Sequence, residues 1–275
     1  MKICVNGRIM LNRFERREKR HKGRHHDSTY IKILAVHPLF VLWLLCILTP
    51  HVVAAADGRA YIELDGGYKT GDFGTPTRSD LYYLAPVFGY VSPAYGFSVT
   101  APYLWLTDET GGQSTTKTGI GDIFLRGDMV FIPEDKRGLS FDGTLAVKLP
   151  TADETKGLGT GETDYGISFG LHRRLEEIKL SFMAGYIKIG APPSLNYNDI
   201  YLYGVGVSRV FTKTNLYASF EGRSSVISGA KNPQELNFGF FHVLSSHYSL
   251  KGNGFFGLND GGPDLGYSVG LVRWF

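Results

Sequence analysis

The chain has 275 residues, 43% of them hydrophobic and 13% aromatic, with 35 glycines, which suits one large all-β domain or two ordinary domains. Its net charge of +3 hides two regions of opposite sign. Residues 1–56 carry ten lysines and arginines against three acidic residues, whereas the remainder carries 19 basic and 23 acidic residues. That acidic remainder excludes a basic footprint for nucleic acid. Both cysteines, Cys4 and Cys46, lie in the first region, which excludes disulfides and thiolate sites from the rest.

Residues 1–56 are predicted to be a cleaved signal peptide with a long basic amino-terminal part, and residues 57–275 to be the mature domain. An apolar run from Leu39 to Leu48 follows the basic part, and small residues precede Asp57. This order is typical of a secretory signal that is cut after Ala56 or one residue earlier. The apolar run is shorter than the ~20 residues of a transmembrane helix, which disfavours a membrane anchor.

From residue 57 onward the apolar residues recur with the period of two that is typical of strands, and no run has helical periodicity. We predict twelve strands separated by turn signals. Most are long enough to cross a bilayer as a tilted strand, which takes ~9–11 residues. The predicted strands are 59–69, 81–91, 94–107, 118–133, 138–149, 164–175, 178–190, 197–211, 214–227, 233–245, 248–259 and 264–275.

One face of these strands is apolar and the opposite face carries several charges. In the strand predicted at 138–149, Leu145 and Val147 lie on the apolar face, whereas Asp142 and Lys148 lie on the polar face. A soluble β-sandwich alternates in the same way, with its apolar face pointing inward. The periodicity alone therefore leaves a sandwich and a membrane barrel as alternatives.

The connections favour the membrane barrel because they alternate in length. Long segments such as 70–80, 108–117 and 150–163 alternate with short ones such as 134–137 and 176–177. Outer-membrane barrels have long external loops and short periplasmic turns, and an even strand count returns both termini to the periplasmic side. We therefore predict an all-β fold, a transmembrane antiparallel up-and-down β-barrel of about twelve strands in the outer membrane of a Gram-negative bacterium.

The last predicted strand ends the sequence on an aromatic residue. Phe275 follows Tyr267, Val269 and Leu271 on the same phase of the alternation. An alternating strand that stops on a terminal Phe looks like the segment that the barrel-assembly machinery of the outer membrane reads. We expect that machinery and outer-membrane lipid to be partners of the chain, expect no nucleic acid, and leave the oligomeric state open.

Three motifs carry a family resemblance. They are Gly119-Ile120-Gly121-Asp122, Lys148-Leu149-Pro150-Thr151, and the segment from Gly157 through Gly159 and Gly161 to Asp164. In this order they resemble the outer-membrane transporter family labelled MetA-pathway of phenol degradation, most specifically over residues 118–172. The resemblance implies a barrel that passes small aromatic or hydrophobic compounds, and it supplies no catalytic residues. The glycine-rich segment lacks the strand-to-helix context and the Lys-Ser/Thr ending of a phosphate loop.

The polar face supplies candidate lumen residues that would set which solutes pass. A hairpin between the fourth and fifth predicted strands would pair Asp122 with Lys148, Arg126 with Thr144, and Asp128 with Asp142. The alternative is that these charges only fill a narrow barrel. A barrel of twelve strands is intermediate in size between small barrels with a packed interior and large barrels with an open channel. The full candidate set is Asp122, Arg126, Asp128, Asp142, Lys148, Glu221, Arg223 and Lys251.

We expect a passive or facilitated channel for small solutes, without cofactor or metal, and not an enzyme. One alternative is a structural or adhesive barrel that acts through its loops. Another is a lipid-modifying enzyme, which needs a Ser–His or similar pair, and the candidates are His242, Ser245, Ser246 and His247. That cluster is predicted at the periplasmic end, the wrong side for a lipid of the outer leaflet.

Overall fold

The computed structural model describes residues 58–73, 75, 77–192 and 196–275, so the predicted signal peptide at 1–56 lies outside the described residues. No helix in this described part of the chain is long and apolar enough to cross a membrane. One short 3-10 helix, η1 (Glu154–Lys156), interrupts an otherwise all-β order. The strands are β1 (Arg59–Gly71), β2 (Arg78–Val91), β3 (Tyr95–Thr100), β4 (Tyr103–Thr110), β5 (Gln113–Ile120), β6 (Ile123–Ile132), β7 (Leu139–Leu149), β8 (Asp164–Leu175), β9 (Ile178–Lys188), β10 (Ile200–Phe211), β11 (Thr214–Arg223), β12 (Gln234–Val243), β13 (Tyr248–Gly257) and β14 (Leu265–Trp274).

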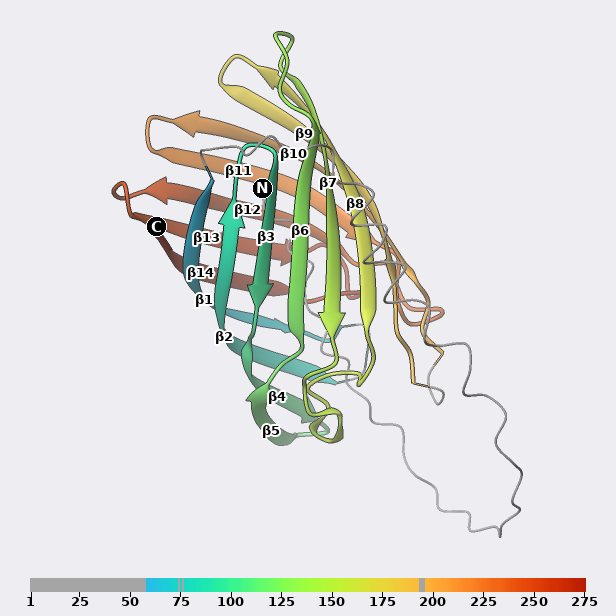
Figure 1. The fold of residues 1–275 in the computed structure, drawn as a ribbon. Helices are drawn as coiled ribbons and strands as arrows, with labels where there is room; N and C mark the ends of the chain where they lie inside the picture. The colour runs from blue at the N-terminus through green and yellow to red at the C-terminus, as the bar shows by residue number, and fades with distance from the viewer. Residues whose placement is uncertain (1–57, 74, 76, 193–195) are drawn as a thin grey trace, which may run out of the picture. The chain divides into compact units, whose positions relative to one another are not determined.

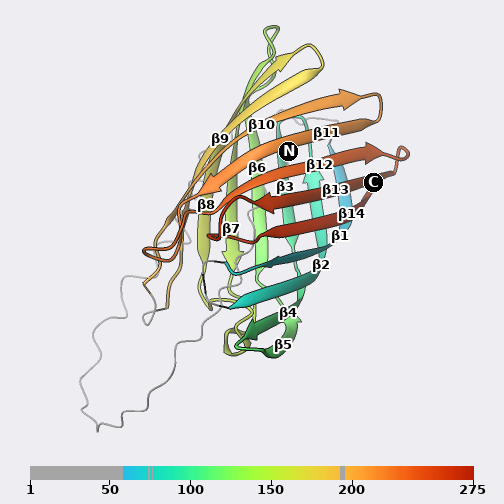
Figure 2. The same ribbon diagram turned by 180° about the vertical axis from the view of Figure 1, so that it is seen from behind.

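β1 closes the sheet into a barrel, because it pairs with β14 on one edge and with β2 on the other (Figure 1). At Leu64 the two partners are Leu271 of β14 and Pro86 of β2. From behind, the strands β9 to β14 follow one another around the wall to β1 (Figure 2). β3 with β4, and β5 with β6, each form one interrupted strand of the wall. The barrel therefore has twelve strands, and the predicted fold class is confirmed.

The wall is interrupted where the third and fourth strands were predicted to be continuous. The long β2 pairs with β4 through Leu84 and Tyr103, and with β3 through Val87 and Thr100. Pro102 lies between these two pairings and has no N–H for a ladder. β6 continues the wall to β7, whereas β5 pairs with β4 alone among the described strands. The predicted loop 108–117 is instead the tip of the β4–β5 hairpin.

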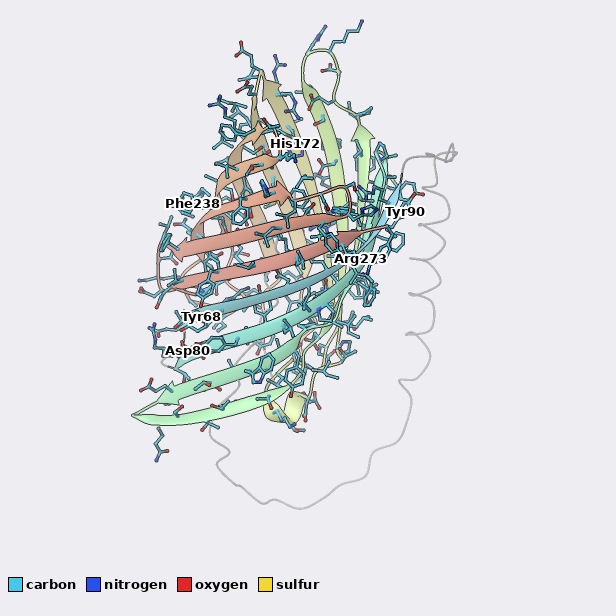
Figure 3. All side chains as sticks on the ribbon, turned by 90° about the vertical axis from the view of Figure 1, so that its left-hand side faces the viewer. Tyr68, Asp80, Tyr90, His172, Phe238 and Arg273 are labelled. Carbon is cyan, nitrogen blue, oxygen red and sulfur yellow. The ribbon has the colours of Figure 1, made fainter. Side chains whose placement is uncertain are left out.

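Side-chain exposure decides which face of the sheet points inward. In β8, Phe169 is 42% exposed whereas the neighbouring Ser168 is 6% exposed, and the alternation continues along the strand. The apolar residues therefore cover the outside and the polar residues line the inside, which is the reverse of a soluble sandwich. Figure 3 shows side chains on both faces of the wall, with Phe238 among the outward ones.

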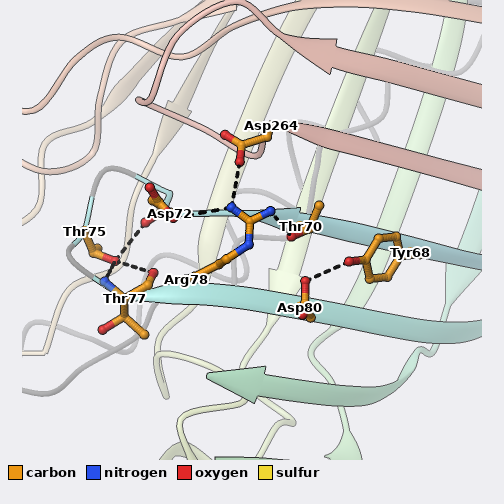
Figure 4. A network of polar contacts seen from close by, with 8 residues as sticks. All are labelled: Tyr68, Thr70, Asp72, Thr75, Thr77, Arg78, Asp80 and Asp264. Carbon is orange, nitrogen blue, oxygen red and sulfur yellow. Dashed lines mark hydrogen bonds and ion pairs between the residues drawn. The ribbon is translucent and has the colours of Figure 1, made fainter. Parts of the chain in front are cut away.

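The two ends of the barrel differ in their connections. Tyr68 and Asp80 lie toward the end with the long loops, and Tyr90 and Arg273 lie toward the opposite end (Figure 3). At the long-loop end, Arg78 donates to Thr70 at 3.0 Å and to Asp264 at 3.2 Å (Figure 4). These contacts join the loop before β14 to the β1–β2 hairpin, so the rim of the barrel is tied together across its closing strands.

Candidate functional site: the lumen

A cavity of about 510 Å³ lies inside the barrel, with most of its wall from β1, β2, β3, β6 and β7. Its lining mixes aromatic rings, such as Tyr61 and Tyr83, with charged groups, such as Lys69 and Asp142. The Lys69 ammonium lies 5.9 Å from the centre of the Tyr83 ring and 6.0 Å from that of Phe255, within range of a cation–π contact. The lumen therefore offers both stacking surfaces and charge.

Lys148 is the centre of a buried cluster near the wall interruption. Its ammonium lies 3.1 Å from an Asp164 carboxylate oxygen and 3.5 Å from one of Asp122, and it donates to the Thr160 hydroxyl at 2.9 Å. Only 6% of the lysine side chain is exposed. We call these four residues the Lys148 cluster. Because the lysine is shared by two carboxylates, it joins β7, β8 and the loop between them.

The loop 150–163 covers the inside of the wall at this point. Leu158 is 1% exposed and packs with Leu81, Leu104 and Leu106 of β2 and β4. A β-carbon at Gly159 would lie 2.8 Å from an Asp122 carboxylate oxygen, so a glycine is required for the loop to approach this closely. The loop therefore folds inward and is not a free external segment.

The ends of this loop are shaped by local hydrogen bonds and by left-handed glycines. The Asp153 carboxylate accepts hydrogen bonds from the Thr155 hydroxyl and backbone, at 2.6 and 3.0 Å, and so begins η1. The hydrogen bond from Thr155 holds the pKa of Asp153 below its ordinary value of 3.8. Gly157 and Gly161 have φ angles of 69° and 71°, which favour glycine.

Arg126 and Asp128 form a second group one step further along β6. The Arg126 guanidinium lies 2.5 Å from Asp128 and donates to Thr144 at 3.2 Å, and Thr144 donates to Asp128 at 2.6 Å. The predicted register was wrong by two residues, because Arg126 is opposite Ala146 and Asp128 is opposite Thr144. Asp122 still reaches Lys148, although it precedes β6 and has no ladder partner there.

Asp142 contacts a histidine and not the predicted aspartate. Nε2 of His172 lies 2.5 Å from the Asp142 carboxylate, and Nδ1 lies 2.9 Å from the Ser181 hydroxyl. The three residues have the types of a hydrolase triad, but His172 and Ser181 are both buried, opposite each other on the inner faces of β8 and β9. Their geometry joins three neighbouring strands, β7, β8 and β9.

Lys251 reaches across a strand to two carboxylates of β1. Its ammonium forms ion pairs with Glu63 and, at 3.3 Å, with Asp65. Gly270 of β14 stands between them, because it pairs with Lys251 on one side and with Asp65 on the other. A β-carbon at Gly270 would lie 2.4 Å from Cε of Lys251 and 2.9 Å from the Asp65 carboxylate. The missing side chain therefore lets the lysine cross β14.

The remaining predicted lumen residues lie on β11. Arg223 forms an ion pair with the buried Glu235 of β12 at 3.1 Å, and Glu221 accepts from Ser219 at 3.0 Å. The eight predicted residues thus fall into separate groups around the wall and do not form one continuous ladder. Sequence reasoning missed Glu63, Asp65 and Glu235, although all three stand on the polar phase of their strands.

The terminal strand presents its predicted signal residues to the outside. Tyr267, Val269, Leu271 and Phe275 are all exposed on the outer face of the barrel. The enzyme candidates lie elsewhere, with His242 near the end of β12 and the other three in the short turn after it, where Ser246 contacts the adjacent His247 ring at 3.0 Å. Among the residues that the structure describes, no group of three His, Cys, Asp or Glu side chains could hold a metal ion.

Comparisons with known proteins agree with this architecture. A crystal structure of the COG4313 outer membrane channel from Pseudomonas putida F1 is similar, with a TM-score of 0.63 at 13% identity, over 79% of this chain and 96% of that one. The KdgM porin in complex with disordered oligogalacturonate is similar with a TM-score of 0.50 at 8% identity, over 78% and 99%. The NanC porin is similar with a TM-score of 0.50 at 12% identity, over 77% and 98%.

At these low sequence identities, the structural similarities show a shared fold. A search among curated proteins gives no match. The sequence profile of one family matches residues 63–272, which is most of the chain and includes every strand of the barrel in whole or in part. The chain therefore belongs to the family described as "Putative MetA-pathway of phenol degradation".

Proposed function

We propose that this barrel is an outer-membrane channel through which small solutes, including apolar and aromatic compounds, pass without an energy source. The observation that carries the proposal is the cavity of about 510 Å³ inside a closed barrel, lined by charged and aromatic side chains. Polar groups inside and apolar groups outside suit a barrel that separates an aqueous path from lipid. The family match and the channel fold support the same function.

The proposed orientation places the long-loop end outside the cell and both termini in the periplasm. Long connections such as 150–163 and 224–233 lie at one end, and short turns such as 176–177 and 212–213 lie at the other. That asymmetry is typical of outer-membrane barrels. In this orientation the Lys148 cluster and the inward loop lie near the external mouth, where they narrow the path.

The alternatives have less support. An adhesive barrel needs loops that project, whereas the loop 150–163 packs inward through Leu158. A lipid-modifying enzyme at Ser245 or Ser246 would act at the end with the short turns. Replacing both serines by alanine should leave transport unchanged, and a loss of transport would favour catalysis. Deleting 152–162 should raise solute flux if the loop narrows the path.

Single-channel current across a planar bilayer tests the proposal, with the chain refolded from Asp57. Discrete conductance steps are expected, and Arg126→Glu or Lys148→Glu should change the preference between cations and anions. Arg209→Gln, on the outer face of β10, is the matched control and should leave that preference unchanged. A folded barrel that shows no steps would contradict an open channel.

A further inference from the structure

The outer surface of the barrel carries a repeated basic position at the end with the short turns. Strands β8, β10 and β14 run toward that end. Each has an outward-facing arginine two residues before the last outward-facing residue. These are Arg173, Arg209 and Arg273. β12 places His242 at the equivalent position, where its Nδ1 lies 2.7 Å from the Thr214 hydroxyl. Four alternate strands thus form a band around half of the wall.

Each arginine of the band is surrounded by apolar side chains that are themselves exposed. Along its own strand, an exposed apolar residue comes both before it and after it on the outer face. These same-strand neighbours are Leu171 and Leu175, Val207 and Phe211, and Leu271 and Phe275. Of the six neighbours across the ladder, five are also exposed and apolar. They are Leu139, Ile178, Leu216, Tyr248 and Ile62, whereas the sixth, Leu180 of β9 opposite Arg173, is apolar but only half-exposed.

The charges of the band are only partly balanced by the protein. Arg209 forms an ion pair with Glu177 at 2.5 Å, and both side chains are more than half exposed. Among the described residues, neither Arg173 nor Arg273 forms an ion pair within 4.0 Å. The pKa of Asp135 in the β6–β7 turn is lowered by the hydrogen bond from the Leu139 backbone, and the nearby charge of Arg173 contributes to this lowering. Arg209 and Arg273 stand over the rings of Phe211 and Phe275, at 4.8 and 5.0 Å from the ring centres.

A cation in an apolar, lipid-facing surface needs an anion at the same depth. Arginine can keep its stem along the apolar surface and place its guanidinium in the headgroup region, where it binds phosphate with paired hydrogen bonds. Each arginine near an anionic lipid surface contributes ~1 kcal/mol of attraction. Two of the guanidinium groups are also held in place, because the phenyl rings of Phe211 and Phe275 lie under them.

We propose that Arg173, Arg209 and Arg273, with His242 beside them, bind the phosphates of anionic glycerophospholipids in the leaflet at the short-turn end. This proposal rests on the proposed membrane location, but not on solute passage. The bound lipids would fix the depth and tilt of this half of the barrel. On the other side of β1 an aromatic residue takes this level, because the exposed Phe88 of β2 is opposite Ile62, the β1 neighbour of Arg273.

Lipid competition tests the band directly. The refolded mature chain is placed in micelles with equal amounts of phosphatidylglycerol and phosphatidylcholine, and native mass spectrometry gives the ratio of the two lipids that stay bound. At low salt, the wild-type ratio of bound phosphatidylglycerol to bound phosphatidylcholine should be greater than one, by a factor of about five for each arginine site. This factor corresponds to the ~1 kcal/mol of attraction per arginine. The ratio should fall as salt is added.

Substitutions then assign the preference to the band. The triple variant R173Q/R209Q/R273Q should bring the ratio close to one, whereas a triple lysine variant should keep most of the preference. Arg78→Gln, at the opposite rim, is the control and should leave the ratio unchanged. A wild-type ratio of one, or a triple glutamine variant that keeps the wild-type ratio, would overturn the proposal.

Two further measurements keep the outcome decisive. If the triple variant does not fold, the single glutamine variants should each lower the ratio. If all three single variants keep the wild-type ratio, the band is contradicted. Conductance separates this proposal from the proposed function. A barrel without conductance but with a lipid preference contradicts the channel alone, whereas normal conductance with a ratio of one contradicts the band alone.

Discussion

Replacing Lys148 by methionine should destabilise the barrel by about 3–5 kcal/mol, the usual cost of removing one partner from a buried ion pair. The change leaves Asp122 and Asp164 facing each other inside the wall without their shared cation. At 3.1 and 3.5 Å, each pair has a bare attraction of about 5 kcal/mol at an effective dielectric constant of about 20. Desolvation of the three groups offsets much of that attraction, so the net loss is smaller than the sum.

Equilibrium unfolding by urea of the barrel refolded in lipid vesicles measures the loss. Lys156→Met, in the loop that follows β7, is the matched control, because that lysine is 54% exposed and lies 3.8 Å from Asp153. An exposed pair contributes ~0–1 kcal/mol, so the control should be close to wild type. Combining Lys148→Met with Asp164→Asn should cost less than the sum of the single changes. Equal losses in Lys148→Met and in the control would refute the reasoning.

Three other changes follow from the lumen. Gly270→Ala should lower the free energy of unfolding by about 1–3 kcal/mol and shift the ion preference, because its β-carbon would overlap Lys251. Gly254→Ala serves as control, because a β-carbon there would have its nearest atom at 3.7 Å. Leu158→Ala should lower the free energy of unfolding by about 2–5 kcal/mol and raise the single-channel conductance, since it removes the most buried contact of the inward loop. Unchanged conductance would show that the loop does not narrow the path. Because the pKa of Asp153 is lowered, its charged form stabilises the loop above pH 3.8, and this contribution is lost as the pH falls through the lowered pKa. Protease cleavage of the loop should therefore increase in that acid range, and Asp153→Asn should remove the dependence.

The architecture could be predicted because lipid imposes a simple pattern on the sequence. Alternation in strands such as β7 and the unequal connections both follow from a closed wall with water inside. The interruption of the third and fourth strands was missed, since alternation continues through 94–107 even though the ladder does not. Pro86 and Pro102, which lack the N–H groups that a ladder needs, were the signals that could have indicated it.

The lumen contacts were harder to predict, because they depend on register and on closure. The β6–β7 turn closes asymmetrically, with Gly138 bonded to Asp135, and a bulge lies between Val130 and Ile132. Both shift the pairing away from the simplest hairpin. The Lys251 ion pairs join β13 to β1 across β14, so they exist only once the barrel is closed. No local sequence pattern indicates such a contact.

The unpaired edge of β5 has a consequence for how deeply the barrel sits in its membrane. A strand edge with unpaired backbone N–H and C=O groups is not tolerated in hydrocarbon, where each such group costs several kcal/mol. The strand is also polar, with Gln113 to Lys117 near its tip. The hydrocarbon layer must therefore end below the β4–β5 hairpin, close to Tyr103 and Trp105, whose rings lie 4.7 Å apart on the outer face. On this side of the barrel the wall interruption thus marks the water surface, and the hairpin stands clear of the lipid.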